Sequence, residues 1–142
     1  MELTGIIYSI GAAITWGLVY TIDQKILGGI SPITLLFIDS ILTFAVIIPF
    51  ILIDRASIIT FVQSGALNIF LVIISLILAL VANYFIYSGI KLIGASTASV
   101  FEISYPLFVV LFSYLFFRSS MSVSFWIGTG LIFIGSIVIL KF

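Results

Sequence analysis

The sequence predicts an all-α integral membrane protein with five transmembrane helices, from its composition, the length of its apolar segments and their pattern. Of the 142 residues, 63% are hydrophobic and 7% charged, and the mean hydropathy is +1.48. A soluble domain carries about 25% charged residues, so five basic and five acidic side chains cannot form its surface. Disorder requires low hydrophobicity and nucleic-acid binding requires a basic face. Both classes are therefore excluded.

Five apolar segments are long enough to cross a membrane, because a spanning helix needs about 20 mostly apolar residues. The expected helices cover residues 3–22, 32–53, 66–90, 95–117 and 122–140. Ser31 and Pro32 are typical of a helix N-terminus. Residues 57–65 are expected to be an interfacial connection. Strands of a β-barrel alternate polar and apolar residues, and no segment does, so we expect a single transmembrane domain over residues 1–142.

Basic residues give only a weak signal for orientation. Five spans place the two ends of the chain on opposite sides of the membrane, and an excess of Lys and Arg on one side sets the orientation. The side of the N-terminus holds Arg55 and Arg118, and the other side holds Lys25, Lys91 and Lys141. Two alternatives stay open: one weakly signalled orientation, or dual topology in which both orientations are inserted.

Glu102 is the first candidate for chemistry. A charged side chain within a span costs at least about 2.5–3.5 kcal/mol on insertion scales. Pro106 lacks an N–H, so the Glu102 carbonyl loses its helical donor and we expect a helix kink at Pro106. An opened turn is tolerated where it faces protein or a water-filled cavity. We expect Glu102 and Tyr105 to bind substrate or a proton; alternatively, Glu102 is paired with a base or protonated and silent.

Three further side chains lie at a depth similar to that of Glu102. Asp39, Asn83 and Glu102 are each about seven residues from the same side of the membrane, and Trp16 is about six. At a rise of 1.5 Å per residue, these side chains lie in one layer roughly 10 Å from that side of the membrane. Tyr87 follows Asn83 by one turn. We expect these side chains to shape a substrate cavity; alternatively, Asp39 reaches water, Trp16 packs against its neighbours, and Asn83 and Tyr87 form interhelical hydrogen bonds.

Small residues recur on one face of the first and last expected helices, and such residues let helices approach closely. They are Gly5, Ser9, Ala13 and Gly17 in the first helix and Gly128 and Gly135 in the last. We interpret the first set as a packing face within one subunit, with a dimer contact as the alternative. The second set is interpreted as a dimer contact, with packing within one subunit as the alternative.

Several residue types that enzymes use are absent. The chain has no cysteine and no histidine, which excludes thiolate nucleophiles, Cys/His metal sites and Ser-His pairs. No glycine-rich phosphate loop ends in Lys-Ser or Lys-Thr. We therefore expect no catalytic residue, no metal, no cofactor and no hydrolysis of ATP by this chain.

Five short motifs, in order along the chain, carry a resemblance to a known family. They are Ala-Ile-Thr-Trp-Gly at 13–17, Gly-Gly-Ile-Ser-Pro at 28–32, Gly-Ala-Ser-Thr-Ala-Ser at 94–99, Tyr-Pro-Leu-Phe at 105–108 and the glycine-rich run at 128–135. The chain resembles one EamA-type half-domain of the drug/metabolite transporter superfamily. Its last helix is also similar to that of the small multidrug resistance family. The chain departs from both families. Residues 3–22 hold no acid, whereas the small multidrug resistance proteins carry a glutamate in this helix. After the helix expected at 95–117, Phe117-Arg118 stands where Gly-Glu is common.

The resemblance implies a secondary transporter of small metabolites or amphipathic cations, working by alternating access. From its position in the span beside Pro106, we expect Glu102 to be the residue that couples transport to protons. The resemblance also implies a multi-pass protein in the cell (cytoplasmic) membrane, surrounded by lipid. Most relatives carry two half-domains as an inverted repeat, so we expect a second copy in inverted orientation, forming a ten-helix antiparallel homodimer. The alternatives are a dimeric channel and one subunit of a heterodimeric transporter.

Overall fold

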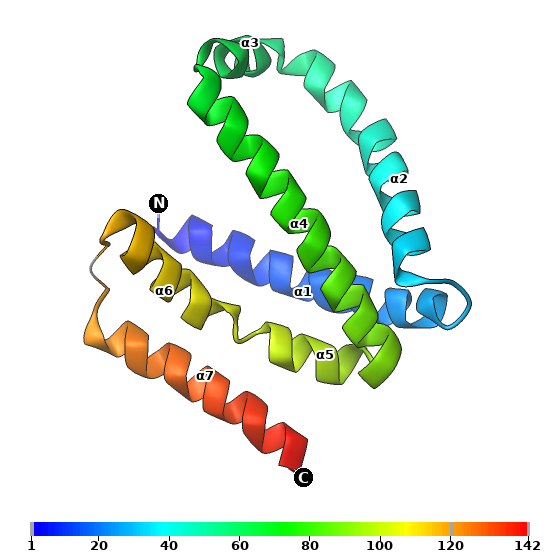
Figure 1. Cartoon of the computed structure of the whole chain (residues 1–142), viewed down its shortest axis with the longest axis vertical. Helices are drawn as coiled ribbons and strands as arrows, with labels where there is room; N and C mark the ends of the chain where they lie inside the picture. Colours follow the sequence, from blue (N-terminus) through cyan, green and yellow to red (C-terminus); the bar gives the residue numbers. More distant parts are fainter. Residues whose placement is uncertain (1, 120, 142) are drawn as a thin grey trace. The chain divides into compact units, whose positions relative to one another are not determined.

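The computed structural model describes residues 2–119 and 121–141, and the described chain is helical with short connections (Figure 1). In order, the helices are α1 (Glu2–Leu27), α2 (Pro32–Ile53), α3 (Arg55–Gln63), α4 (Ala66–Ile93), α5 (Ala95–Glu102), α6 (Tyr105–Phe117) and α7 (Val123–Lys141). Four helical stretches are long and apolar enough to cross a membrane, and a shorter apolar helix follows. The four are Leu3–Leu27, Pro32–Ile53, Ala66–Ile93 and Ala95–Phe117, and the shorter one is Val123–Ile139.

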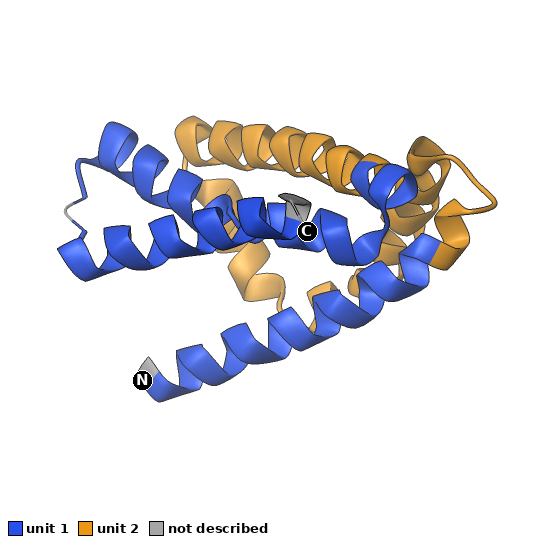
Figure 2. Ribbon diagram, turned by 90° about the horizontal axis from the view of Figure 1, so that it is seen from below, with its two compact units in different colours: residues 1–24, 89–142 blue, residues 25–88 orange. Residues whose placement is uncertain are grey.

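The chain divides into two compact units, coloured separately in Figure 2. Unit 1 consists of residues 1–24 and 89–142, and unit 2 of residues 25–88. In unit 1, α7 packs along α5 and α6. The last turn of α6 closes at Arg118, which has a left-handed φ of 51°. The Ser119 N–H donates to the Ser113 carbonyl at 3.3 Å, a bond typical of a Schellman helix end.

Unit 2 contains α2 and α4, joined by α3. Pro32 occupies the first position of α2, and the Ser31 hydroxyl accepts the Thr34 N–H at 3.2 Å. This cap satisfies one of the amide groups that a helix start leaves without a helical acceptor. The expected start of this helix is therefore found at the expected residue.

The helices differ from their expected bounds by more than one residue at four places. The first continues to Leu27, because the first strong helix-breaking residues are Gly28 and Gly29 rather than the polar residues before them. Helix α4 likewise continues past residue 90 to Ile93, because Gly94 is the first strong helix-breaking residue after it. Most of the connection expected at 57–65 is the helix α3. The fourth expected helix is interrupted at Ile103 and Ser104, so that α5 and α6 replace one continuous helix.

Most large apolar side chains of the described helices are exposed, and the largest fully buried ones are Leu27, Ile90 and Val110. Exposing apolar area to water costs about 25 cal/mol per Å². A surface of this kind suits lipid or another protein chain. Together with the hydropathy of the long helices, it makes the chain a multi-pass membrane protein.

Candidate functional site

Glu102 is the last residue of α5, at the interruption of the helical stretch 95–117. The Ser104 N–H, which in a regular helix donates to the carbonyl four residues earlier, donates instead to Phe101 at 3.1 Å. Pro106 lies near the start of α6 and offers no N–H to the Glu102 carbonyl. The interruption thus lies just before Pro106, and it places the Glu102 carboxyl at the end of a half-helix.

Tyr20 of α1 holds the Glu102 carboxyl. Its hydroxyl donates to Glu102 Oε1 at 2.8 Å, and the tyrosine is only 8% exposed. The ring of Trp16 lies 5.4 Å from the Tyr20 ring, centroid to centroid, and is about half exposed. We call Trp16, Tyr20 and Glu102 the Glu102 cluster. No sequence pattern singles out Tyr20, although it follows Trp16 by one helical turn and so shares its face.

Ser136 of α7 lies against the other side of the interruption. This buried hydroxyl donates to the Val100 carbonyl at 2.9 Å or to the Ile132 carbonyl of its own helix at 3.0 Å. Its Oγ is also 3.2 Å from the Oγ of Ser104, which is buried as well. In a regular helix the Ser104 N–H would donate to the Val100 carbonyl, so the interruption leaves this carbonyl without its usual donor. Ser136 therefore supplies, from another helix, a hydrogen bond that the interruption removes.

Gln24 binds the beginning of α5. Its side-chain Oε1 accepts the Ala95 N–H at 2.5 Å. Gly94, which precedes Ala95, has a φ of +83°, a conformation that favours glycine. Because Gln24 lies one turn beyond Tyr20, α1 is hydrogen-bonded to both ends of α5. Sequence reasoning missed both Gln24 and Ser136, since contacts between distant helices leave no local pattern.

Asp39 and Tyr87 are brought together in unit 2. The Tyr87 hydroxyl donates to Asp39 Oδ2 at 2.6 Å, a length typical of a charge-assisted hydrogen bond. Tyr87 is buried, whereas Asp39 and Asn83 are half-buried. Asn83 lies one turn before Tyr87 on α4. Neither Asp39 nor Glu102 belongs, among the described residues, to a group of three or more side chains that could hold a metal ion.

The remaining predicted residues lie on open surfaces. Tyr105 begins α6 and is 61% exposed, outside the hydrogen bonds described for the Glu102 cluster. Ser9 and Ala13 are exposed on α1. A Cβ added to a glycine of either small-residue face would meet nothing within 4 Å in the described chain; these glycines are Gly5, Gly17, Gly128 and Gly135. Within unit 1, these glycines therefore do not pack against another described helix.

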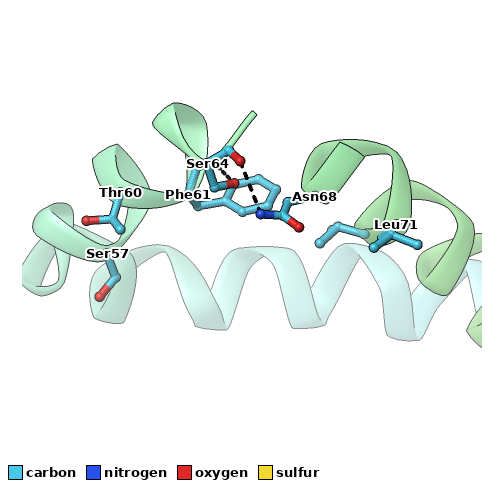
Figure 3. A pocket seen from close by; sticks show the side chains of 7 residues that line it. Ser57, Thr60, Phe61, Ser64, Asn68 and Leu71 are labelled. Carbon is cyan, nitrogen blue, oxygen red and sulfur yellow. Dashed lines mark hydrogen bonds between the residues drawn. The ribbon is translucent and has the colours of Figure 1, made fainter. Parts of the chain in front are cut away.

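A pocket of about 510 Å³ lies elsewhere, between α3 and the start of α4 (Figure 3). Its lining consists of Ser57, Thr60, Phe61, Ser64, Asn68, Leu71 and Val72. Two of its polar side chains bind nearby backbone, since the Asn68 amide donates to the Ser64 carbonyl and the Ser64 hydroxyl to the Phe61 carbonyl. Asn68 and Tyr87 are separated by about 28 Å along α4. The pocket is therefore distinct from the Asp39 pair.

The EamA-like transporter family matches residues 3–141. The chain belongs to this family. The family resemblance drawn from the sequence motifs is thereby confirmed, and this EamA-like chain is a membrane transporter of small molecules rather than an enzyme. No curated protein and no solved structure matches it in the comparisons.

Proposed function

We propose that this EamA-like chain is a secondary transporter of small metabolites or amphipathic cations, in which Glu102 binds a proton and a cationic substrate in turn. One observation carries the proposal: a carboxyl group stands at the interruption of an apolar helical stretch. Ionisable groups inside a span are costly and are typical of functional sites. Broken helices in transporters form the substrate and ion sites near the middle of the membrane.

The exchange requires only that one carboxyl group serve two ligands. When the cation arrives, the O–H bond of the protonated Glu102 breaks and the proton leaves to water. The carboxylate then pairs with the cation. Trp16 presents a half-exposed ring in the same cluster, and the face of an indole ring attracts a cation. Asp39, bound by Tyr87, is a second candidate for the same chemistry.

Two copies in opposite orientations form the complete transporter in this proposal. Residues 3–141 match the family domain once, and we take this domain as one half of the inverted repeat on which alternating access rests. The glycine faces of α1 and α7 are open within unit 1, so a second copy can approach them closely. The nearly even division of basic residues between the two sides agrees with insertion in both orientations.

The test is ethidium uptake into proteoliposomes driven by a pH gradient. Glu102→Gln removes the ionisable group while keeping its size, and we expect uptake to fall to the level of protein-free vesicles. Asp54→Asn is the matched control, because Asp54 is an exposed acid at the end of α2 that accepts a hydrogen bond from Ser57. Full gradient-driven uptake by Glu102→Gln would overturn the exchange role. A wild-type protein that moves no ethidium would overturn the cationic substrate.

A further inference from the structure

We infer that Tyr20 is a positioning residue for Glu102: its hydroxyl fixes Oε1 and leaves Oε2 to bind the proton or the cationic substrate. The inference rests on the proposed function of Glu102. Its basis is the 2.8 Å hydrogen bond between the two side chains, which joins helices 82 positions apart in the sequence.

Besides this bond itself, two hydrogen bonds to the backbone hold α5. Gln24, one turn beyond Tyr20, accepts the Ala95 N–H at the start of α5. Tyr20 itself reaches the carboxyl at the end of α5. Ser136 donates to the Val100 carbonyl in the last turn of the same helix. With α5 held from α1 at both ends and from α7 near its end, the Tyr20 hydroxyl approaches the carboxyl from a fixed direction.

The second carboxyl oxygen is available. Within residues 2–119 and 121–141, no hydrogen bond to Glu102 Oε2 is present, and the side chain is half-buried rather than enclosed. A tyrosine hydroxyl is an uncharged donor. It therefore orients the carboxylate without supplying the positive charge that a lysine or arginine would bring. The counter-charge is left to the proton or the substrate, as exchange requires.

Unit 2 repeats this arrangement independently. Asp39 also lies in a long apolar helix, and one of its oxygens accepts a hydrogen bond from a buried tyrosine of another helix, Tyr87, at 2.6 Å. Both acids thus use the same neutral donor on one oxygen. The recurrence favours a shared device for holding an acid in a membrane over a chance contact.

Tyr20→Phe tests the inference, because it keeps the ring that contacts Trp16 and removes only the hydroxyl. A hydrogen bond to a charged group contributes about 1.5–3 kcal/mol, so we expect the KM for ethidium to rise about tenfold or more. The turnover number should change far less, because Glu102 itself remains. Tyr8→Phe is the matched control, since Tyr8 lies on the same helix and is 76% exposed.

Infrared difference spectroscopy gives a readout that transport does not influence. The carboxyl C=O band of protonated Glu102 is identified by its loss in Glu102→Gln. It should move to higher wavenumber in Tyr20→Phe, because the C=O group loses a donor, and stay in place in Tyr8→Phe. Glu2 and Glu102 are the two glutamates of the chain. An NMR cross-peak between a tyrosine Cζ and a glutamate carboxyl carbon in labelled wild-type protein therefore tests the contact without any variant.

The outcomes separate this inference from the proposed function. If Glu102→Gln keeps gradient-driven uptake, the proposed function fails whatever Tyr20 does. If Glu102→Gln stops uptake while Tyr20→Phe equals Tyr8→Phe in KM and in band position, only the positioning role is overturned. Absence of the NMR cross-peak in the wild-type protein would also overturn it, even if Tyr20→Phe did not fold.

Discussion

Replacing Ser136 by alanine should destabilise the protein through a single carbonyl group. In the interrupted stretch, the Ser104 N–H donates to Phe101, so the Val100 carbonyl depends on the Ser136 hydroxyl 2.9 Å away. Ser136 is only 3% exposed. Interhelical hydrogen bonds in membrane proteins average about 0.6 kcal/mol and reach about 1.7. Leaving a buried polar group without a partner costs about 1–3 kcal/mol.

We therefore expect Ser136→Ala to lower the free energy of unfolding by about 1.5 kcal/mol, within the range of these two effects. The assay is equilibrium unfolding in mixed micelles, followed by circular dichroism. Ser124→Ala is the control, because Ser124 is exposed on the same helix and surface substitutions usually stay within about 0.5 kcal/mol.

A double-mutant cycle with Ser104 makes the reasoning sharper. Ser104→Ala alone should cost less than Ser136→Ala, because Ser136 can still donate to Val100. The free energy of unfolding of the double variant should lie within about 0.5 kcal/mol of that of Ser136→Ala, because the two hydroxyls interact and their effects do not add. An effect of Ser136→Ala equal to that of Ser124→Ala would refute the account of the interruption.

Three other predictions concern topology, association and the helix interruption. If both orientations are inserted, as we propose, a single cysteine at Ser119 should be about half reactive with an impermeant maleimide in intact cells; all-or-none labelling contradicts this. Gly135→Leu places a large side chain on the open face of α7 and should reduce the yield of cross-linked dimer, whereas Gly130→Leu should leave that yield unchanged. Equal yields from the two variants would contradict a dimer contact at Gly135. Pro106→Ala restores an N–H to the Glu102 carbonyl and should stabilise the protein by about 1 kcal/mol while slowing ethidium uptake; an unchanged rate argues against a role for the interruption.

The all-helical membrane class and the approximate position of the helix interruption could be predicted because they depend on local chemistry. A carboxyl group and a proline four residues later stand out in an apolar segment, so Glu102 and Pro106 draw attention without a structure. Ser31 and Pro32 likewise predict the start of α2. The signal at Glu102 and Pro106 comes from the cost of placing a charge, or of losing an N–H, where water is absent. The signal at Ser31 and Pro32 comes from the groups that a helix start requires.

The partners of these residues could not be predicted, because they depend on packing between distant helices. Tyr20 has no unusual neighbours in the sequence, and its role becomes visible only where its hydroxyl meets Glu102. The same is true of Gln24 at the start of α5 and of Ser136 beside the interruption. The exact position of the interruption, at Ile103 and Ser104, could not be predicted from Pro106 alone either.

The central claim is that one carboxyl group exchanges a proton for a cation, and proton release on cation binding tests it most directly. Purified protein in weakly buffered detergent is mixed with ethidium, and a pH indicator reports the protons released. The wild-type protein should release protons as ethidium binds, Asp54→Asn should match it, and Glu102→Gln should release none. Equal release by the wild-type protein and Glu102→Gln would contradict the account, as would ethidium binding without any release by the wild-type protein.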